Sequence, residues 1–186
     1  MGVRVMCPAF SYRRSVRLPG YNYASIGAYF VTICAADRRC LFGEMEDIAV
    51  KVTLCGHVVE ESWRWLAQKY PFVHLDEWVL MPNHLHAIIW LAEGCSKPLG
   101  SLVGAFKTVS SRRIKAQEGS RTQIWQQNYY EHIIRSDKAL LALRQYIRDN
   151  PVQWAQDAEN PKLPIVYGAR PGVSSLDWAA LEPPLR

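Results

Sequence analysis

The stretch from Met81 to Trp90 restricts the fold of this chain more than any other part of the sequence. Its second half is apolar and rich in β-branched residues, which is typical of a buried strand, and Met-Pro-Asn at its start is a turn signal. Side chains alternate along a strand, so His84 and His86 would share one face with their Cα atoms about 6–7 Å apart. Two imidazoles at this spacing can bind one divalent metal ion. A His-x-His pair without further context is more often an incidental polar pair on an edge strand, so other residues must decide between these interpretations.

Length and composition indicate one ordinary globular domain with tails. The chain has 186 residues, of which 49% are hydrophobic and 21% charged, which excludes a largely disordered protein. There is no apolar run of the ~20 residues that a membrane span needs and no secretory h-region near the N-terminus, so no membrane partner is expected. Five scattered cysteines without a Cys-x-x-Cys pair indicate reduced thiols and a cytoplasmic protein.

The positive charge favours an anionic partner such as a nucleic acid. The net charge is +5, and the basic residues gather in residues 1–20, which contain no acid, and in residues 97–121, where Glu118 is the single acid. Such clusters are usually solvated faces, and as a phosphate-binding surface they are suggestive. The candidates for contact with nucleic-acid phosphates are Arg13, Arg14, Arg17, Lys107, Arg112 and Arg113.

The order of predicted elements indicates an α+β fold. The pattern is strand, helix, strand, strand, helix, strand, followed by a C-terminal helix. This is the ferredoxin-like split βαβ arrangement, an antiparallel sheet with helices on one face, here with the extra helix at the C-terminal end. The predicted strands are residues 29–34, 72–80, 84–90 and 124–135, with a short extra strand at 48–52, and the predicted helices are 54–70, 99–116 and 138–150.

The last predicted helix carries a second pair of candidate residues. Tyr146 and Asn150 are four positions apart and would project from one helix face, before Pro151 stops the helix. The two imidazoles and the Asn150 oxygen could hold a metal ion that polarises a phosphodiester, while the Tyr146 oxygen attacks phosphorus. An ordinary structural interpretation has Tyr146 filling helix-to-sheet space and Asn150 ending a helix.

Several blocks of the sequence resemble one family, the HUH-type single-tyrosine transposases, and specifically the REP-associated tyrosine transposases. The likeness covers about residues 13–157, with the blocks in matching order. It implies a nuclease domain over residues 21–157, between a basic N-terminal arm at 1–20 and an irregular, proline-rich tail at 158–186. The blocks are Arg17–Tyr21, Met81–His86, Phe106-Lys107, Trp125–Arg135 and Tyr146–Pro151.

The resemblance implies an enzyme that cuts single-stranded DNA beside a hairpin with Mg²⁺ or Mn²⁺. It would leave a 5′-phosphotyrosine and a free 3′-OH, and would rejoin strands by transesterification during DNA transposition. Position by position, His84 and His86 match the metal histidines, Tyr146 the nucleophile and Asn150 the third ligand. Relatives with glutamine at this last position are familiar. The resemblance also implies repeated DNA palindromes as partners and a protein associated with the nucleoid. Whether the protein forms a homodimer whose subunits exchange the tyrosine helix stays open.

Alternatives stay open at two levels. Tyr129 and Tyr130 compete with Tyr146 as nucleophile, and His132 could substitute as a ligand beside Tyr130. The whole chain could instead be a non-catalytic regulator that binds DNA hairpins and kept the fold. A (β/α)₈ metal hydrolase is excluded, because that barrel takes ~250 residues and strictly alternating elements.

Overall fold

A computed structural model describes residues 18–119, 122–157 and 160–162 of the protein. The arm residues Arg13, Arg14 and Arg17 and most of the predicted tail lie outside these ranges. The described elements, apart from two short 3₁₀ turns, are β1 (Gly27–Cys34), β2 (Gly43–Glu46), β3 (Ala49–Val52), α1 (Leu54–Lys69), β4 (Val73–Leu80), β5 (His84–Leu91), α2 (Leu99–Glu118), β6 (Tyr130–Ile134) and α3 (Asp137–Gln153).

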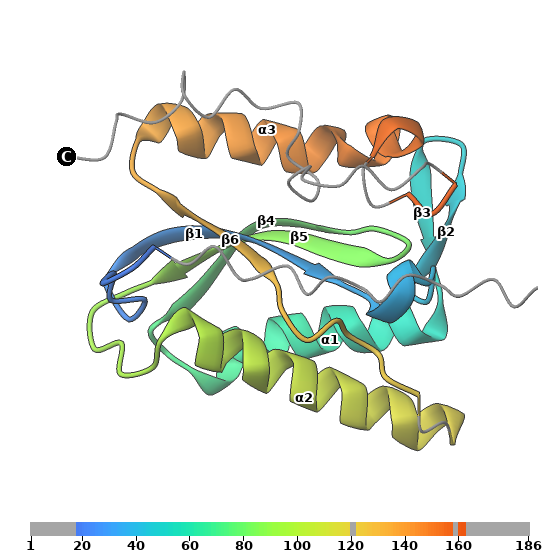
Figure 1. The fold of residues 1–186 in the computed structure, drawn as a ribbon, viewed down its shortest axis with the longest axis horizontal. Coiled ribbons are helices and arrows are strands. Elements are labelled where there is room, and N and C mark those ends of the chain that lie inside the picture. The colour runs from blue at the N-terminus through green and yellow to red at the C-terminus, as the bar shows by residue number, and fades with distance from the viewer. Residues whose placement is uncertain (1–17, 120–121, 158–159, 163–186) are drawn as a thin grey trace, which may run out of the picture.

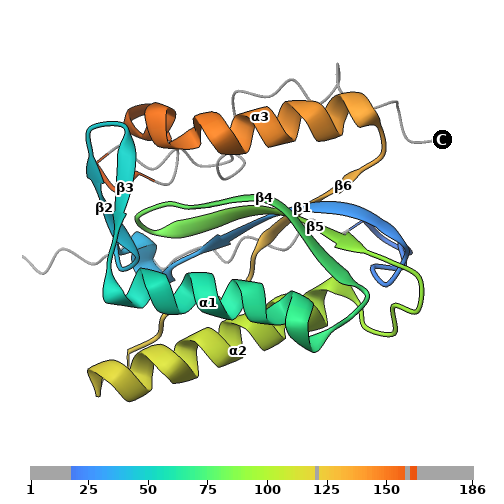
Figure 2. The same cartoon turned by 180° about the vertical axis from the view of Figure 1, so that it is seen from behind.

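The main sheet has four antiparallel strands in the order β4-β5-β1-β6. The helices α1 and α2 cover one face of the sheet, and α3 crosses the other face (Figures 1 and 2). The predicted α+β, ferredoxin-like arrangement with a C-terminal helix is therefore confirmed, and the structure adds that this helix lies alone on the second face. None of the helices in the described part of the chain is long and apolar enough to span a bilayer.

The sheet separates two apolar layers, because successive side chains of a strand point to opposite faces. The larger layer, between the sheet and α1–α2, contains the alternate residues Tyr29, Val31 and Ile33 of β1. The smaller layer lies under α3 and contains Phe30 of β1 and Ile88 of β5. Since His84 and His86 have the same parity as Ile88, they lie on the α3 face of the sheet.

Two predicted boundaries were wrong, and one strand was not predicted. Helix α3 does not stop before Pro151 but continues to Gln153, because proline removes only one backbone donor and the buried residues Tyr146, Ile147 and Asn150 hold this turn against the sheet. The predicted strand at 124–135 is a strand only from Tyr130. The predicted strand at 48–52 is half of a hairpin with β2, a segment for which no strand was predicted.

Candidate functional site

The two histidines lie at one end of β5, fully buried on the face that α3 covers. Their rings meet, with the two Nε2 atoms 2.9 Å apart. Burial, and to a smaller extent the nearby His84, holds the pKa of His86 well below its ordinary value. His86 is therefore neutral near pH 7, which is the form of imidazole that binds metals.

Hydrogen bonds on the far side of each ring orient these nitrogens. The Asn83 side chain donates from Nδ2 to the Arg38 carbonyl (3.0 Å), which turns its Oδ1 toward His84 Nδ1, 2.9 Å away. An amide oxygen only accepts, so His84 Nδ1 carries the proton and Nε2 keeps its lone pair. His86 Nδ1 lies 2.8 Å from the Thr32 hydroxyl, which can accept in the same way.

The two Nε2 atoms thus face one another at a distance that fits either a single N–H···N hydrogen bond or two ligands of a shared cation. Ligand atoms at a right angle around an octahedral Mg²⁺ ion, each about 2.1 Å from it, lie about 3 Å apart. The observed separation of 2.9 Å matches that value. Partners at Nδ1 that fix the tautomer are also the usual outer contacts of metal-binding histidines.

Helix α3 brings Tyr146 to this pair. The Tyr146 hydroxyl lies 3.4 Å from His86 Nε2, and its ring packs against His86 and Phe30. The tyrosine is 8% exposed, so its oxygen faces the site instead of open solvent. The predicted meeting of the tyrosine helix with the histidine strand is observed within one chain.

Asn150 follows Tyr146 by one turn on the same buried face of α3. Its exposed fraction is 2%, and its Oδ1 accepts no hydrogen bond from any residue within the described ranges. The residue one further turn on, Trp154, packs against the His84 ring. Asn150 therefore lies along α3 between two residues whose rings contact the histidine pair. A buried amide oxygen without a donor costs about 1–3 kcal/mol, and a cation would offset this cost.

The structure adds a carboxylate that the sequence did not indicate. Asp157 follows α3 and a short 3₁₀ turn (Trp154–Gln156), and its Oδ2 lies 3.7 Å from His84 Nε2. One ligand atom each from His84, His86 and Asp157 lie within 4.8 Å of one another. The chemistry of the whole donor set, two imidazoles, an amide oxygen and a carboxylate, fits a divalent cation.

Two ion pairs attach α3 to the edge strand β4. Arg144 donates from Nε and Nη2 to the two carboxylate oxygens of Asp76, at 2.9 and 2.6 Å, and Arg148 pairs with Glu77. The pairing of β4 with β5 shifts in register between Leu75 and Trp78. A bulge of this kind redirects side chains, and here both adjacent acids reach the helix on either side of Tyr146.

The competing tyrosines lie elsewhere. Tyr129 packs with the α1–α2 layer and has the Lys107 ammonium 5.7 Å from its ring centroid. Tyr130 is on the α3 side, but it pairs with Thr32 of β1, and β1 separates it from β5. The backbone of β6, which also carries His132, is therefore two strand spacings, about 9.6 Å, from that of the histidine strand.

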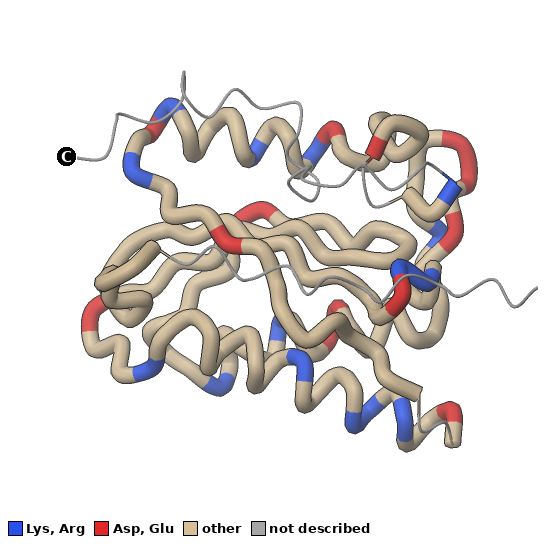
Figure 3. The backbone as a smooth tube through the Cα atoms, in the orientation of Figure 1, with Lys and Arg blue, Asp and Glu red and all other residues tan. Residues whose placement is uncertain are grey.

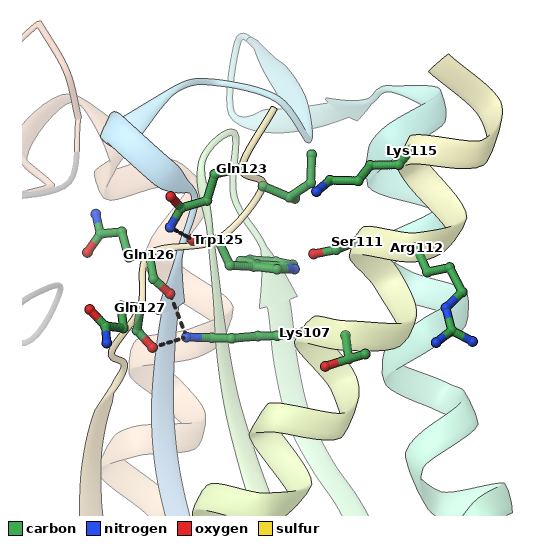
Figure 4. A pocket seen from close by; sticks show the side chains of 10 residues that line it. Lys107, Ser111, Arg112, Lys115, Gln123, Trp125, Gln126 and Gln127 are labelled. Atoms are coloured by element: carbon green, nitrogen blue, oxygen red, sulfur yellow. Dashed lines mark hydrogen bonds between the residues drawn. The ribbon is translucent and has the colours of Figure 1, made fainter. Parts of the chain in front are cut away.

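Basic residues recur along α2, which has Glu118 as its single acid (Figure 3). An open groove of about 630 Å³ runs between α2 and the segment 123–127 (Figure 4). Arg112 and Lys115 line it from the helix, and Trp125 and Gln126 from the segment. A backbone bridge from Trp125 to Ala35 attaches this segment just beyond β1, whose last residue pairs with His84. The groove and the histidine pair therefore lie at the same end of the sheet.

Two of the predicted DNA contacts also have structural partners. The Lys107 ammonium donates to the carbonyls of Gln126, Gln127 and Asn128, at 2.8, 3.3 and 2.9 Å (Figure 4 shows the first two), and burial lowers its pKa to about 8. Arg113 donates to the Ser62 hydroxyl of α1 at 3.3 Å. Arg112 is exposed beside the groove.

A sequence profile described as "Transposase IS200 like" matches residues 27–150, which span the sheet, the histidine pair, Tyr146 and Asn150. The chain belongs to the IS200-like transposase family. Among its relatives is an uncharacterized protein of Haemophilus influenzae, 40% identical over 167 residues, a match covering 78% of this chain and 92% of that protein.

One further relative of the chain and one solved structure of similar fold carry a functional name. The REP-associated tyrosine transposase of Escherichia coli is 24% identical over 160 residues, covering 84% of this chain and 87% of that protein. A solved structure of a REP-associated tyrosine transposase bound to a REP hairpin superposes with a TM-score of 0.57 at 22% identity, covering 94% of this chain and 98% of the other. This structural likeness shows a shared fold.

Proposed function

We propose that this transposase cuts and rejoins single-stranded DNA beside a hairpin through a covalent tyrosine intermediate. The observation that carries the proposal is the contact between the Tyr146 hydroxyl and His86 Nε2, 3.4 Å apart, in a member of a transposase family. A buried tyrosine beside a histidine pair of this kind supports the proposal, because its oxygen could attack a phosphate that a bound ion polarises.

His84, His86 and Asn150 would hold a divalent ion, Mg²⁺ or Mn²⁺, through two imidazole nitrogens and one amide oxygen. When bound, the ion would supply charge to offset the negative charge that develops on the phosphate oxygens. Asn83 would keep His84 in the tautomer that this role requires, and the Thr32 hydroxyl can accept from His86 Nδ1 so that His86 takes the same tautomer.

The reaction exchanges one phosphodiester bond for another. The Tyr146 oxygen, having given its proton to water, forms a bond to phosphorus while the bond from phosphorus to the DNA 3′-oxygen breaks. The leaving 3′-oxygen takes up a proton and becomes a free 3′-OH, and the downstream strand stays attached to Tyr146 through its 5′-phosphate. Attack by a 3′-OH on this phosphotyrosine reverses the exchange and rejoins DNA. Since Tyr146 meets His86 of its own chain, a single subunit could carry out these steps.

Arg112 and Arg113 of α2, with Lys107, would neutralise phosphates of the DNA, as would the arm residues Arg13, Arg14 and Arg17. The groove beside Arg112 and Lys115 is an open basic surface at the same end of the sheet as the histidines. The REP hairpin in the structure of a relative supports hairpin DNA as the ligand class for this chain.

The test uses a DNA hairpin with single-stranded flanks, labelled at its 3′ end, because the covalent fragment carries that end. Incubation with Mn²⁺ is expected to give a labelled protein band that survives denaturation, and EDTA is expected to prevent it. A flank-only oligonucleotide without the hairpin is the matched substrate control. A protein that retards the hairpin in a native gel but forms no covalent band would instead be a non-catalytic hairpin-binding regulator.

A further inference from the structure

We infer that Asp157 is an additional, anionic ligand of the divalent ion at the histidine pair. The inference rests on the proposed function, because it concerns the same ion. Asp157 lies outside the residues that the family profile matches. Its side chain is 3% exposed and shares a ligand cluster with His84 and His86.

The distance between the carboxylate and His84 fits two ligands of one ion. The 3.7 Å from Asp157 Oδ2 to His84 Nε2 is too long for a hydrogen bond. Ligand atoms around an octahedral ion lie about 3 Å apart at a right angle and about 4.2 Å apart when opposite. The observed value falls between these two, so an ion next to the histidines would be within reach of Asp157.

Charge favours the same role. His84, His86 and Asn150 are neutral donors, and a buried divalent ion held by neutral groups alone has its charge poorly compensated. Mg²⁺ and Mn²⁺ prefer oxygen ligands and carboxylates above all. Asp157 supplies this charge from the protein itself, before any DNA phosphate is present.

A ring of hydrogen bonds holds Asp157 in place and closes on the histidine motif. The Asn160 backbone donates to the Asp157 carbonyl at 2.9 Å, and its side chain donates to the Trp154 carbonyl at 3.0 Å. Arg38 donates to the Asn160 carbonyl at 2.8 Å. The Arg38 carbonyl in turn accepts from Asn83, the partner of His84. The segment after α3 is thereby attached to the same residues that orient the metal histidine.

The test measures Mn²⁺ binding to the full chain without DNA, from the free Mn²⁺ signal in electron paramagnetic resonance. Asp157→Asn is expected to weaken Mn²⁺ binding about tenfold or more, the scale at which groups around a metal site act. Asp149→Asn is the matched control, since it removes the same charge near the same helix end from a residue that bonds to Gln145. The Mn²⁺ affinity of Asp149→Asn should stay within about twofold of that of the wild type.

The outcomes separate this inference from the proposed function. If His84→Ala abolishes Mn²⁺ binding while Asp157→Asn binds as the wild type does, Asp157 is not a ligand and the histidine site stands. If the wild type binds no Mn²⁺, the metal site of the proposed function fails as well. Should Asp157→Asn not fold, Asp157→Glu and Asp157→Gln can be compared instead, because the two new side chains have equal length and differ in charge. The Glu variant is expected to bind at least about tenfold more tightly, and equal affinities would overturn the inference.

Discussion

Tyr146 of α3 and His86 of β5, sixty positions apart in the sequence, meet with their polar atoms 3.4 Å apart. Helix α3, which carries Tyr146, covers one face of the sheet, and the His86 side chain projects from β5 toward that same face. Among the residues that the structure describes, the other tyrosines lie on β6 or pack on the far side of the sheet. The position of the Tyr146 oxygen therefore leads to a specific expectation about the nucleophile.

Tyr146→Phe is expected to abolish the covalent protein–DNA band and to leave hairpin affinity within about threefold, because it removes one oxygen and keeps the packing against Phe30. The labelled hairpin assay and a gel-shift titration measure the two effects. Tyr130→Phe is the matched control and should still form the covalent product. Loss of that product in Tyr130→Phe, with Tyr146→Phe active, would move the nucleophile to β6.

The ion pair between Arg144 and Asp76 is expected to position the nucleophile. Arg144→Met should lower the rate of covalent product formation with little change in hairpin affinity, because α3 loses a two-point attachment beside Tyr146. It should also cost about 1–2 kcal/mol of unfolding free energy, since Asp76 is mostly buried. Single-turnover rates and urea unfolding give both numbers.

Arg148→Met is the comparison for this prediction, because the pair of Arg148 with Glu77 is more exposed and should contribute less than about 1 kcal/mol to the free energy of unfolding.

The ion pair between Arg144 and Asp76 also predicts that stability depends on pH. Burial raises the pKa of Asp76, but hydrogen bonds from Arg144 and Trp90 outweigh burial and lower it overall. The stabilisation is then present above about pH 4 and lost as the pH falls through the lower folded-state pKa. If the unfolding free energy falls equally with acid in the wild type and in Arg144→Met, the predicted pH effect of this ion pair is contradicted.

Periodicity and strand alternation were enough to predict the order of the helices and of the main-sheet strands along the chain, the antiparallel sheet and the shared face of His84 and His86. These features follow from local patterns that each segment carries in itself. The family resemblance then selected Tyr146 and Asn150 from among other tyrosines and amides. Neither source indicated Asp157, because it lies beyond a proline in a segment without periodicity. Hydrogen bonds that join Trp154, Asp157 and Asn160 hold it beside the histidines.

The end of α3 and the start of β6 escaped prediction for the same reason. Local rules favour a stop before Pro151, while the burial of Ile147 and Asn150 keeps the helix intact. The residues before Tyr130 have strand composition, yet the carbonyls of residues 126–128 accept hydrogen bonds from the Lys107 ammonium instead of from a neighbouring strand. Tertiary contacts decide both boundaries.

Lys107 predicts a pH dependence of stability. Its folded-state pKa of about 8 lies below the ordinary value near 10.4, so between these values the unfolded chain binds more protons than the folded one. The contribution of Lys107 to the unfolding free energy should therefore rise as the pH increases from about 8 to about 10. Urea unfolding of the wild type and Lys107→Met at pH 7.5 and 9.5 tests this, and an identical difference at both pH values would contradict the assignment.

Arg112 is expected to contribute one phosphate contact. Arg112→Gln should weaken hairpin binding at low salt and reduce the slope of log affinity against log salt by about 0.7–0.9, the amount for one phosphate. Lys69→Gln at the exposed end of α1 removes the same charge away from the groove and should leave the slope unchanged. Filter binding between about 50 and 200 mM salt is sufficient. Equal slopes for the wild type and Arg112→Gln would remove this residue from the DNA surface.

Asn150 allows a test in which stability and metal binding change in opposite directions. Its buried Oδ1 has no donor among the residues that the structure describes, so the folded protein without metal carries a cost of about 1–3 kcal/mol. Asn150→Leu, which has a similar shape, should raise the thermal midpoint of the metal-free protein or leave it unchanged, because that cost disappears. The same variant should lose most of the stabilisation that Mn²⁺ gives to the wild type, because one ligand is gone. Thermal unfolding with Mn²⁺ and with EDTA measures both quantities. A lower midpoint in EDTA together with an unchanged Mn²⁺ shift would show that Asn150 is a structural residue and not a ligand.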